Sequence, residues 1–185
     1  ARVGVPDRLA TYAYMSAPLR FGYVDTAHGQ MHYRAAGLGE PLTRSVLLLH
    51  WTPGSGAQYD AFLHELARRG FRAFAPDLAG YGASPGGARD WLIADFAKNV
   101  LEIAQVLTPV PFALLGGHVA AEVAAQAALL APERISHLIL DGSPTWDREF
   151  RHKLLADIRP TAPKPVADGS HLVQWWQHIL WEMKL

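Results

Sequence analysis

The chain has 185 residues, of which half are hydrophobic and 18% are charged, and this is the composition of a folded globular domain. Seventeen basic residues balance seventeen acidic ones, so we expect neither nucleic acid nor an anionic membrane as a partner. The absence of cysteine excludes disulfides and thiolate chemistry. We find no signal peptide and no apolar run of about 18 residues, and therefore expect a cytoplasmic protein without a membrane span.

Strand-like and helical patterns alternate after an arm of twenty residues. Two strands, 21–25 and 30–34, predict a β-hairpin. Continuous apolar runs then predict parallel strands that are covered on both faces, at 46–49, 71–75, 112–115 and 138–140. Apolar stripes at helical spacing predict helices over 59–66, 92–107 and 118–130. The alternation predicts an α/β fold with three layers, α/β/α, around a mostly parallel sheet of about six strands.

The pattern changes near residue 145, so we expect a core over 1–145 and a helical tail over 146–185. Within the tail, 147–158 predicts a helix and the proline-rich stretch 159–169 predicts a linker. The last helix carries an apolar stripe from Leu172 to Met183, but Trp175 and Trp181 lie off that stripe. A helix that is apolar on more than one face needs more than one cover. We therefore expect a homodimer through this helix, and the alternative is that it covers its own domain.

The most informative stretch runs from Leu114 to Ala120, LLGGHVA. An apolar strand meets a glycine pair, one residue follows, and an alanine-rich helix begins at once. This is the layout of a nucleophile elbow, G-x-S-x-G, in which a sharp turn lifts a serine above a parallel sheet. Here His118 holds the position of the serine, and Ala120 replaces the last glycine. The sequence therefore predicts the scaffold for nucleophilic catalysis without the usual nucleophile.

Three motifs follow three successive predicted strands: LHWTPGSG from Leu49, DLAGYGAS from Asp77, and the elbow at His118. In this order they resemble the α/β-hydrolase superfamily, over residues 21–141. The resemblance implies ester or amide hydrolysis or acyl transfer on a small-molecule ester, amide or acyl substrate, without a cofactor. It also implies a truncated chain, because the family's catalytic histidine comes after a later strand. The tail resembles the start of the helical cap that many members insert.

The resemblance also assigns positions in the expected site. The oxyanion donors would be the backbone N–H groups of Val119 and Thr52, with Trp51 as the alternative to Thr52. The pocket would include His50, Tyr81 and Trp146, although a buried loop-bracing role is the other interpretation of His50. The glycines around Tyr81 predict a structural turn.

Asp141 follows the last predicted strand, where it would either orient the His118 imidazole as a catalytic partner or cap a loop. Three interpretations of His118 stay open. The chain is a fragment or active-site variant of a hydrolase, or it is a non-catalytic pseudo-hydrolase that binds a ligand or partner. In the third, His118 itself acts as nucleophile or general base. No metal site is expected, since the histidines lack metal-binding spacing.

Overall fold

The computed structural model describes residues 18–86, 91–143, 147–157 and 164–182. It divides into two compact units, residues 1–144 and 145–185, which are treated separately below. None of the described helices is long and apolar enough to cross a membrane.

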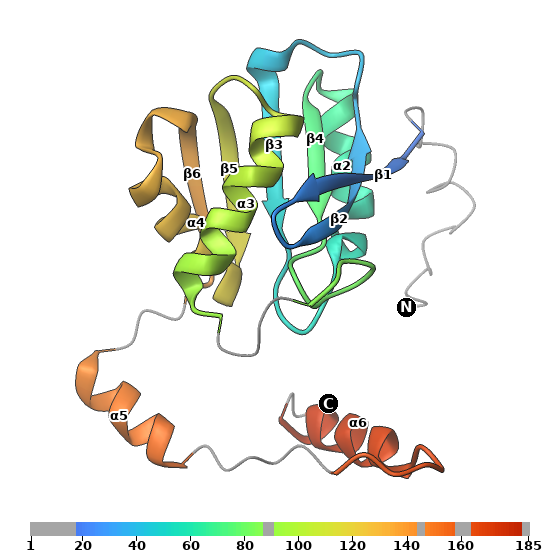
Figure 1. Cartoon of the computed structure of the whole chain (residues 1–185), viewed down its shortest axis with the longest axis vertical. Coiled ribbons are helices and arrows are strands. Elements are labelled where there is room, and N and C mark those ends of the chain that lie inside the picture. The colour runs from blue at the N-terminus through green and yellow to red at the C-terminus, as the bar shows by residue number, and fades with distance from the viewer. Residues whose placement is uncertain (1–17, 87–90, 144–146, 158–163, 183–185) are drawn as a thin grey trace, which may run out of the picture. The chain divides into compact units, whose positions relative to one another are not determined.

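The first unit is built on a six-stranded sheet with the order β1-β2-β4-β3-β5-β6 (Figure 1). Strands β1 and β2 form an antiparallel hairpin and β2 pairs antiparallel with β4, whereas the pairs β3–β4, β3–β5 and β5–β6 are parallel. This confirms the predicted α/β fold with a mostly parallel sheet. The strands are β1 Arg20–Thr26, β2 Gly29–Ala36, β3 Ser45–Leu49, β4 Arg72–Pro76, β5 Phe112–Gly117 and β6 Ile135–Asp141.

Helices cover both faces of this sheet. Helices α3 (Ile93–Leu107) and α4 (Val119–Leu130) lie on one face, and α2 (Asp60–Arg68) lies on the other (Figure 1). Successive residues of β3 point to opposite faces, so Leu47 and Leu49 join the core under α3 and α4 while Val46 and Leu48 join the core under α2. Burial on both faces is the reason why this strand is apolar throughout.

Short connections complete the unit. They include the 3₁₀ helices Leu42–Arg44, Gly56–Tyr59 and Pro132–Arg134. The predicted stripe on α3 needs one correction, because Leu92 is 70% exposed. Leu92 is the N-cap, with extended backbone, and Ile93 begins the helix. A side chain that precedes the first helical turn does not follow the 3.6-residue period.

Strand β6 closes one edge of the described sheet. Its last apolar residues are between 39% and 46% exposed, although the residues of β3 are all buried. They are Leu138, Ile139 and Leu140. The buried strand and the exposed one have the same apolar pattern, so the sequence does not distinguish a central strand from an edge.

The second unit contains α5 (Arg148–Asp157) and α6 (Ser170–Glu182). On α6, Leu172, Val173 and Trp176 are more than half exposed. Large apolar side chains of this kind are common at protein interfaces. Dimerisation through this helix stays a prediction, which light scattering can test.

Candidate functional site

The elbow lies where β5 turns into α4. His118 is the N-cap of α4 and has φ 56° and ψ −127°, the only positive φ of any described residue other than glycine. Its backbone N–H donates to the carbonyl oxygen of Asp141, 2.8 Å away, which ties the turn to the end of β6. The side chain is exposed. The predicted strand, turn and helix are confirmed, and the turn presents an imidazole to solvent.

Two glycines allow this turn to form. A Cβ on Gly116 would collide with the carbonyl oxygen of Ala120, so the glycine and the small buried alanine let α4 approach β5 closely. A Cβ on Gly117 would lie 3.2 Å from the hydroxyl of Tyr59. That hydroxyl donates to the carbonyl oxygen of Leu49 at 3.2 Å, and burial raises the pKa of Tyr59.

Asp141 is the last residue of β6, and its register partner on β5 is Gly117, next to His118. The structure therefore brings the two predicted catalytic residues to the same turn. Their link is through the backbone: no hydrogen bond or ion pair joins the described side chains of His118 and Asp141. Asp141 thus fixes the position of the turn, while no described residue accepts a hydrogen bond from the imidazole to orient it.

The loop after β3 runs beside the elbow. The backbone nitrogen of Trp51 is 3.9 Å from the Cβ position of Gly117, and Thr52 lines a pocket together with Val119. Val119 begins α4, and the first N–H groups of a helix have no acceptor within it. The positive end of the helix dipole lies at the same point. The predicted oxyanion donors therefore lie at one end of the sheet, with the Trp51 side chain 52% exposed.

His50 is placed differently from the predicted pocket residue. It is fully buried, and it is not among the residues that line the pocket. Its Nδ1 lies 2.8 Å from the carbonyl oxygen of Trp51, and its Nε2 accepts from the N–H of Leu78 at 3.0 Å. The proton therefore belongs on Nδ1. Burial lowers the pKa of this imidazole, against the smaller opposing effects of the Trp51 carbonyl and the Asp77 carboxylate.

A second buried group holds the loop after β4. Asp77 is 2% exposed, and its carboxylate accepts from the N–H groups of Gly56 (2.6 Å) and Ala83 (2.9 Å) and from His32 Nδ1 (2.9 Å). The hydroxyl of Ser84 donates to the backbone carbonyl of Asp77 at 2.8 Å. Burial raises the pKa of Asp77, but the donated hydrogen bonds offset this and hold it below its ordinary value.

We call His32, His50, Asp77 and Ser84 the brace, because together they hold the loops after β3 and β4. Gly82, at φ 55°, belongs to the same turn, and a Cβ there would collide with the Asp77 carboxylate. The glycine-rich motif from Asp77 is therefore a loop-fixing device, in agreement with the predicted structural turn.

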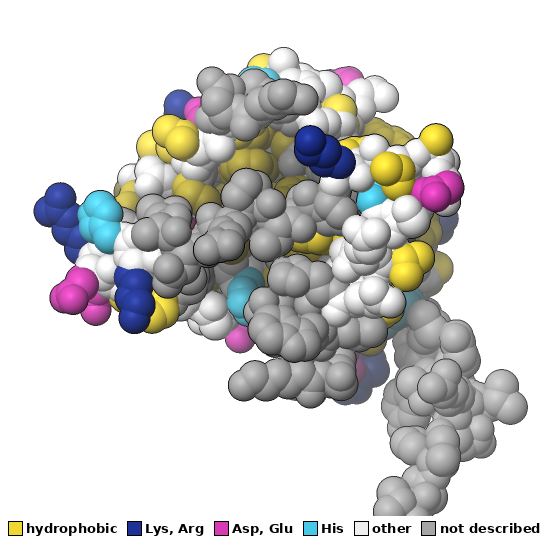
Figure 2. Space-filling view, turned by 90° about the horizontal axis from the view of Figure 1, so that it is seen from below, with side chains coloured by type: hydrophobic (Ala, Val, Ile, Leu, Met, Phe, Trp, Pro, Cys, Tyr) yellow, Lys and Arg dark blue, Asp and Glu magenta, His cyan; other side chains and the backbone are white. Residues whose placement is uncertain are grey.

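A small pocket of about 70 Å³ opens beside the elbow. Figure 2 is drawn from below the view of Figure 1, which is the side where the loops after β3 and β4 lie. The pocket lies along the first turns of α4 and α3. It is lined by Thr52, Leu78, Tyr81, Ile93, Phe96, Val119, Ala120 and Val123. Tyr81 is a lining residue as predicted, whereas Trp146 falls outside the described residues.

Five lining residues were not singled out by sequence reasoning: Leu78, Ile93, Phe96, Ala120 and Val123. Phe96 was assigned to the core stripe of α3, and Ala120 and Val123 to the helix after the elbow. For Leu78, Ala120 and Val123 the available signal is proximity in the chain to the motifs at Asp77 and His118, whereas Ile93 and Phe96 lie outside all three motifs. Among the described residues, no group of three or more acidic or histidine side chains is placed to hold a metal ion.

Comparisons with known proteins agree with this geometry. A pimeloyl-[acyl-carrier protein] methyl ester esterase of Nitrosomonas europaea is 33% identical over 113 residues, which are 61% of this chain and 41% of that protein. An uncharacterized protein of Mycobacterium tuberculosis is 30% identical over 116 residues, covering 62% of this chain and 33% of its own length. The chain therefore spans less than half the length of these curated relatives.

Solved structures give the same fold. The N-acyl homoserine lactonase AidH superposes with a TM-score of 0.63 at 23% identity, over 71% of this chain and 48% of the lactonase. An epoxide hydrolase from an endophytic Streptomyces superposes with a TM-score of 0.60 at 27% identity, over 66% of this chain and 36% of that one. The profile of the alpha/beta hydrolase fold family matches residues 44–164, and the chain belongs to this family.

Proposed function

We propose that the chain carries the nucleophile side of a hydrolase centre for carboxylic esters and related acyl compounds, with the His118 imidazole at the position of attack. One observation carries the proposal. His118 is held at φ 56° and ψ −127° at the start of α4, with its side chain exposed. Backbone strain of this kind costs about 1–3 kcal/mol and is concentrated at functional sites.

The chemistry follows from the position of the groups. A neutral imidazole nitrogen would attack the ester carbonyl carbon, and the carbonyl oxygen would become an oxyanion facing the N–H groups of Val119 and of Thr52 or Trp51. Collapse would break the ester C–O bond, and the alcohol would leave with the proton lost from the imidazole. Water would then hydrolyse the acyl-imidazole, which returns the free acid and the neutral ring. The same imidazole could instead activate the water as a general base.

The relatives support an electrophilic carbon centre as the target. Their names cover a methyl ester esterase, an N-acyl homoserine lactonase and an epoxide hydrolase. Attack on a carboxylic carbonyl is the reaction for which paired backbone N–H donors are suited, because the charge develops on the carbonyl oxygen. We therefore favour esters over epoxides.

A second candidate function is non-catalytic binding of a ligand or partner in the same pocket. The observation that favours it is that no described side chain forms a hydrogen bond with the His118 ring and so fixes its orientation. In a working triad the base is fixed by a third group, and the loss of that group is costly.

Turnover of a small activated ester separates the two functions. Free imidazoles hydrolyse such esters slowly, so the control is His137→Ala, which removes another exposed histidine, at the register partner of Ala113 on β5. We expect His118→Ala to abolish most of the turnover and His137→Ala to leave it unchanged. Equal small losses in both variants would refute the catalytic proposal and favour binding.

His118→Ser gives an independent check of the missing base. A serine needs a neighbouring base to become nucleophilic. Among the described residues no imidazole is placed as the partner of position 118, so we expect this variant to be inactive. Restored turnover would show a base supplied from elsewhere in the chain.

A further inference from the structure

The pocket beside the elbow is chemically uniform. Of the eight described residues that line it, six have aliphatic or aromatic hydrocarbon side chains, and the polar ones are Thr52 and Tyr81. None of these described residues carries a carboxylate, ammonium or guanidinium group. A charged group that entered would lose its hydration without gaining a partner, which is costly. The lining therefore selects a neutral, apolar group.

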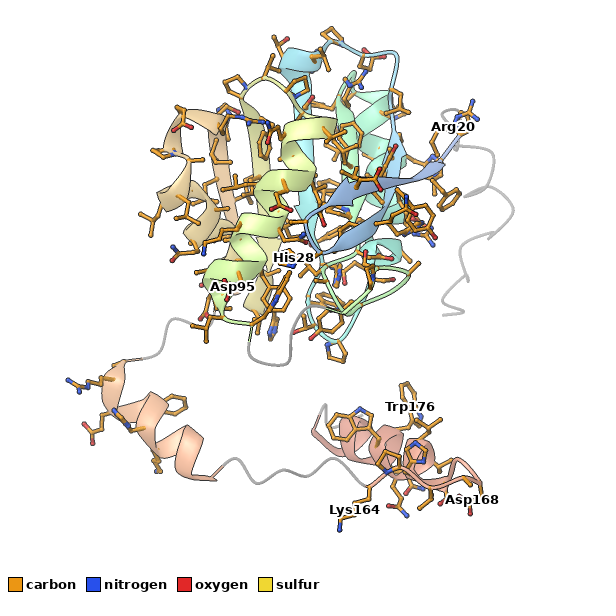
Figure 3. All side chains as sticks on the ribbon, viewed as in Figure 1. Arg20, His28, Asp95, Lys164, Asp168 and Trp176 are labelled. Carbon is orange, nitrogen blue, oxygen red and sulfur yellow. The ribbon has the colours of Figure 1, made fainter. Side chains whose placement is uncertain are left out.

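Aromatic contacts fix the wall of the pocket that α3 supplies. Phe96 packs edge to face against Trp91, with 5.1 Å between ring centroids, and Trp91 packs in the same way against His28 at 4.6 Å. His28 belongs to the β1–β2 turn, and Figure 3 shows it at the same end of the domain as Asp95 in the first turn of α3. Edge-to-face contacts add about 0.5–1.5 kcal/mol each beyond area burial. These contacts fix the position of the Phe96 ring.

The opposite wall belongs to α4. Ala120 and Val123 are 0% and 2% exposed, so this side is continuous with the core, while Val119 at the elbow is 37% exposed. The pocket therefore follows the first turns of α3 and α4, and Phe96 and Val123 are the described lining residues that lie furthest along each helix from its start. An apolar cavity of about 150 Å³ holds benzene. A pocket of about 70 Å³ suits a chain of about two to four carbons.

We infer that the substrate presents a short, neutral, straight-chain acyl group of about two to four carbons to this pocket, and that Phe96 and Val123 set the length limit. The inference rests on the proposed function, because only attack on a carbonyl at His118 makes the bound group an acyl group. It goes further by naming the substrate class and two specificity-determining residues.

Binding of primary amides tests this without any turnover. Acetamide, propionamide, butyramide, hexanamide and octanamide are titrated into the full chain, and the methyl resonances of Val119 are followed by NMR. Each methylene that enters the pocket should tighten binding about fourfold. We expect this gain up to butyramide and no further gain for the two longer amides. Continued tightening to octanamide, or no binding of any amide, would overturn the inference.

Variants test which residues set the limit on chain length. Phe96→Ala and Val123→Ala each enlarge the pocket at the end that these two side chains line, so both should extend the gain to hexanamide. Val123→Ala carries the test if Phe96→Ala does not fold, as judged by circular dichroism. The matched control is Phe62→Ala on α2, on the other face of the sheet and 42% exposed, which should leave the limit unchanged. A limit that does not move in Val123→Ala would refute the role of this wall.

The outcome is separable from the proposed function. If amides bind with the limit at four carbons but esters are not hydrolysed, the proposed hydrolysis fails and the pocket chemistry stands as that of a binding site. If esters are hydrolysed at rates that ignore acyl length in wild type and Val123→Ala alike, the hydrolysis stands and this inference fails.

Discussion

Two histidines at the same end of the sheet have opposite environments. His50 is fully buried, and both of its ring nitrogens have hydrogen-bond partners in the backbone of neighbouring loops. His118 is exposed, has a positive φ, and forms no described hydrogen bond through its ring. The first arrangement stabilises the neutral ring and fixes the loops, and the second leaves a ring available to a ligand.

Two aspartates repeat the contrast. Asp77 lies in the brace, where three donors surround its carboxylate, whereas Asp141 is exposed and holds the elbow through its backbone carbonyl. Buried polar groups are stabilising only when they are fully hydrogen-bonded. We therefore assign the brace to stability and, under the proposed function, the elbow to chemistry, and variants on the two sides should differ in the size and sign of their effect on stability.

The largest effect is expected at Asp77. Asp77→Ala leaves the N–H groups of Gly56 and Ala83 and the ring of His32 without their acceptor. Removing one partner of a buried charged network typically costs about 3–5 kcal/mol. Urea unfolding should show a loss of this size. The control, Asp141→Ala, removes an exposed carboxylate and should stay within about 0.5 kcal/mol of wild type. Equal losses of unfolding free energy in Asp77→Ala and Asp141→Ala would refute the distinction between brace and elbow.

A smaller loss is expected at Gly82. An alanine there would adopt φ 55° and place its Cβ against the Asp77 carboxylate. We expect a destabilisation of about 1–3 kcal/mol, measured by thermal unfolding. Gly39→Ala is the matched control, because no atom lies within 4 Å of its Cβ position. A Gly82→Ala variant as stable as Gly39→Ala would show that the turn can move away from Asp77.

The third effect is a dependence on pH. The pKa of His50 is lowered by burial, so below about pH 6.5 the unfolded chain binds a proton that the folded chain does not. Stability from this residue is present above pH 6.5 and is lost as the pH falls, by at most about 1.4 kcal/mol per pH unit. Unfolding free energies at pH 7.5 and 5.5 should differ more in wild type than in His50→Gln. The control His137→Gln should show the same change of unfolding free energy with pH as the wild type. A wild-type protein that is more stable at pH 5.5 than at pH 7.5 would contradict a buried neutral ring at His50.

The sequence predicts the elements of the sheet and the elbow for clear physical reasons. Strands buried on both faces are continuously apolar, as β3 is, and the glycine pair before His118 permits the close approach of α4. A loop-bracing role is one of the two interpretations that the sequence gives for His50, but the His32–Asp77 contact was not predicted, because the two residues are 45 positions apart in the chain and no local pattern connects them. Five of the described lining residues of the pocket were missed for a related reason. An apolar side chain such as Phe96 has the same signature in a core and in a pocket wall.

The smallest effect should have the opposite sign to the others. His118→Gly removes the side chain from a residue at φ 56° and ψ −127°, a conformation that glycine adopts without steric cost. Glycine also gains entropy in the unfolded chain, which partly offsets this relief, so we expect a net stabilisation of about 1 kcal/mol. His118→Ala keeps the Cβ and should not be stabilised. Thermal unfolding of the two variants beside wild type measures the difference. A stabilised His118→Gly variant without ester turnover would support the view that strain at the elbow is maintained for the proposed function. A destabilised His118→Gly variant would mean that the imidazole contributes to folding as His50 does.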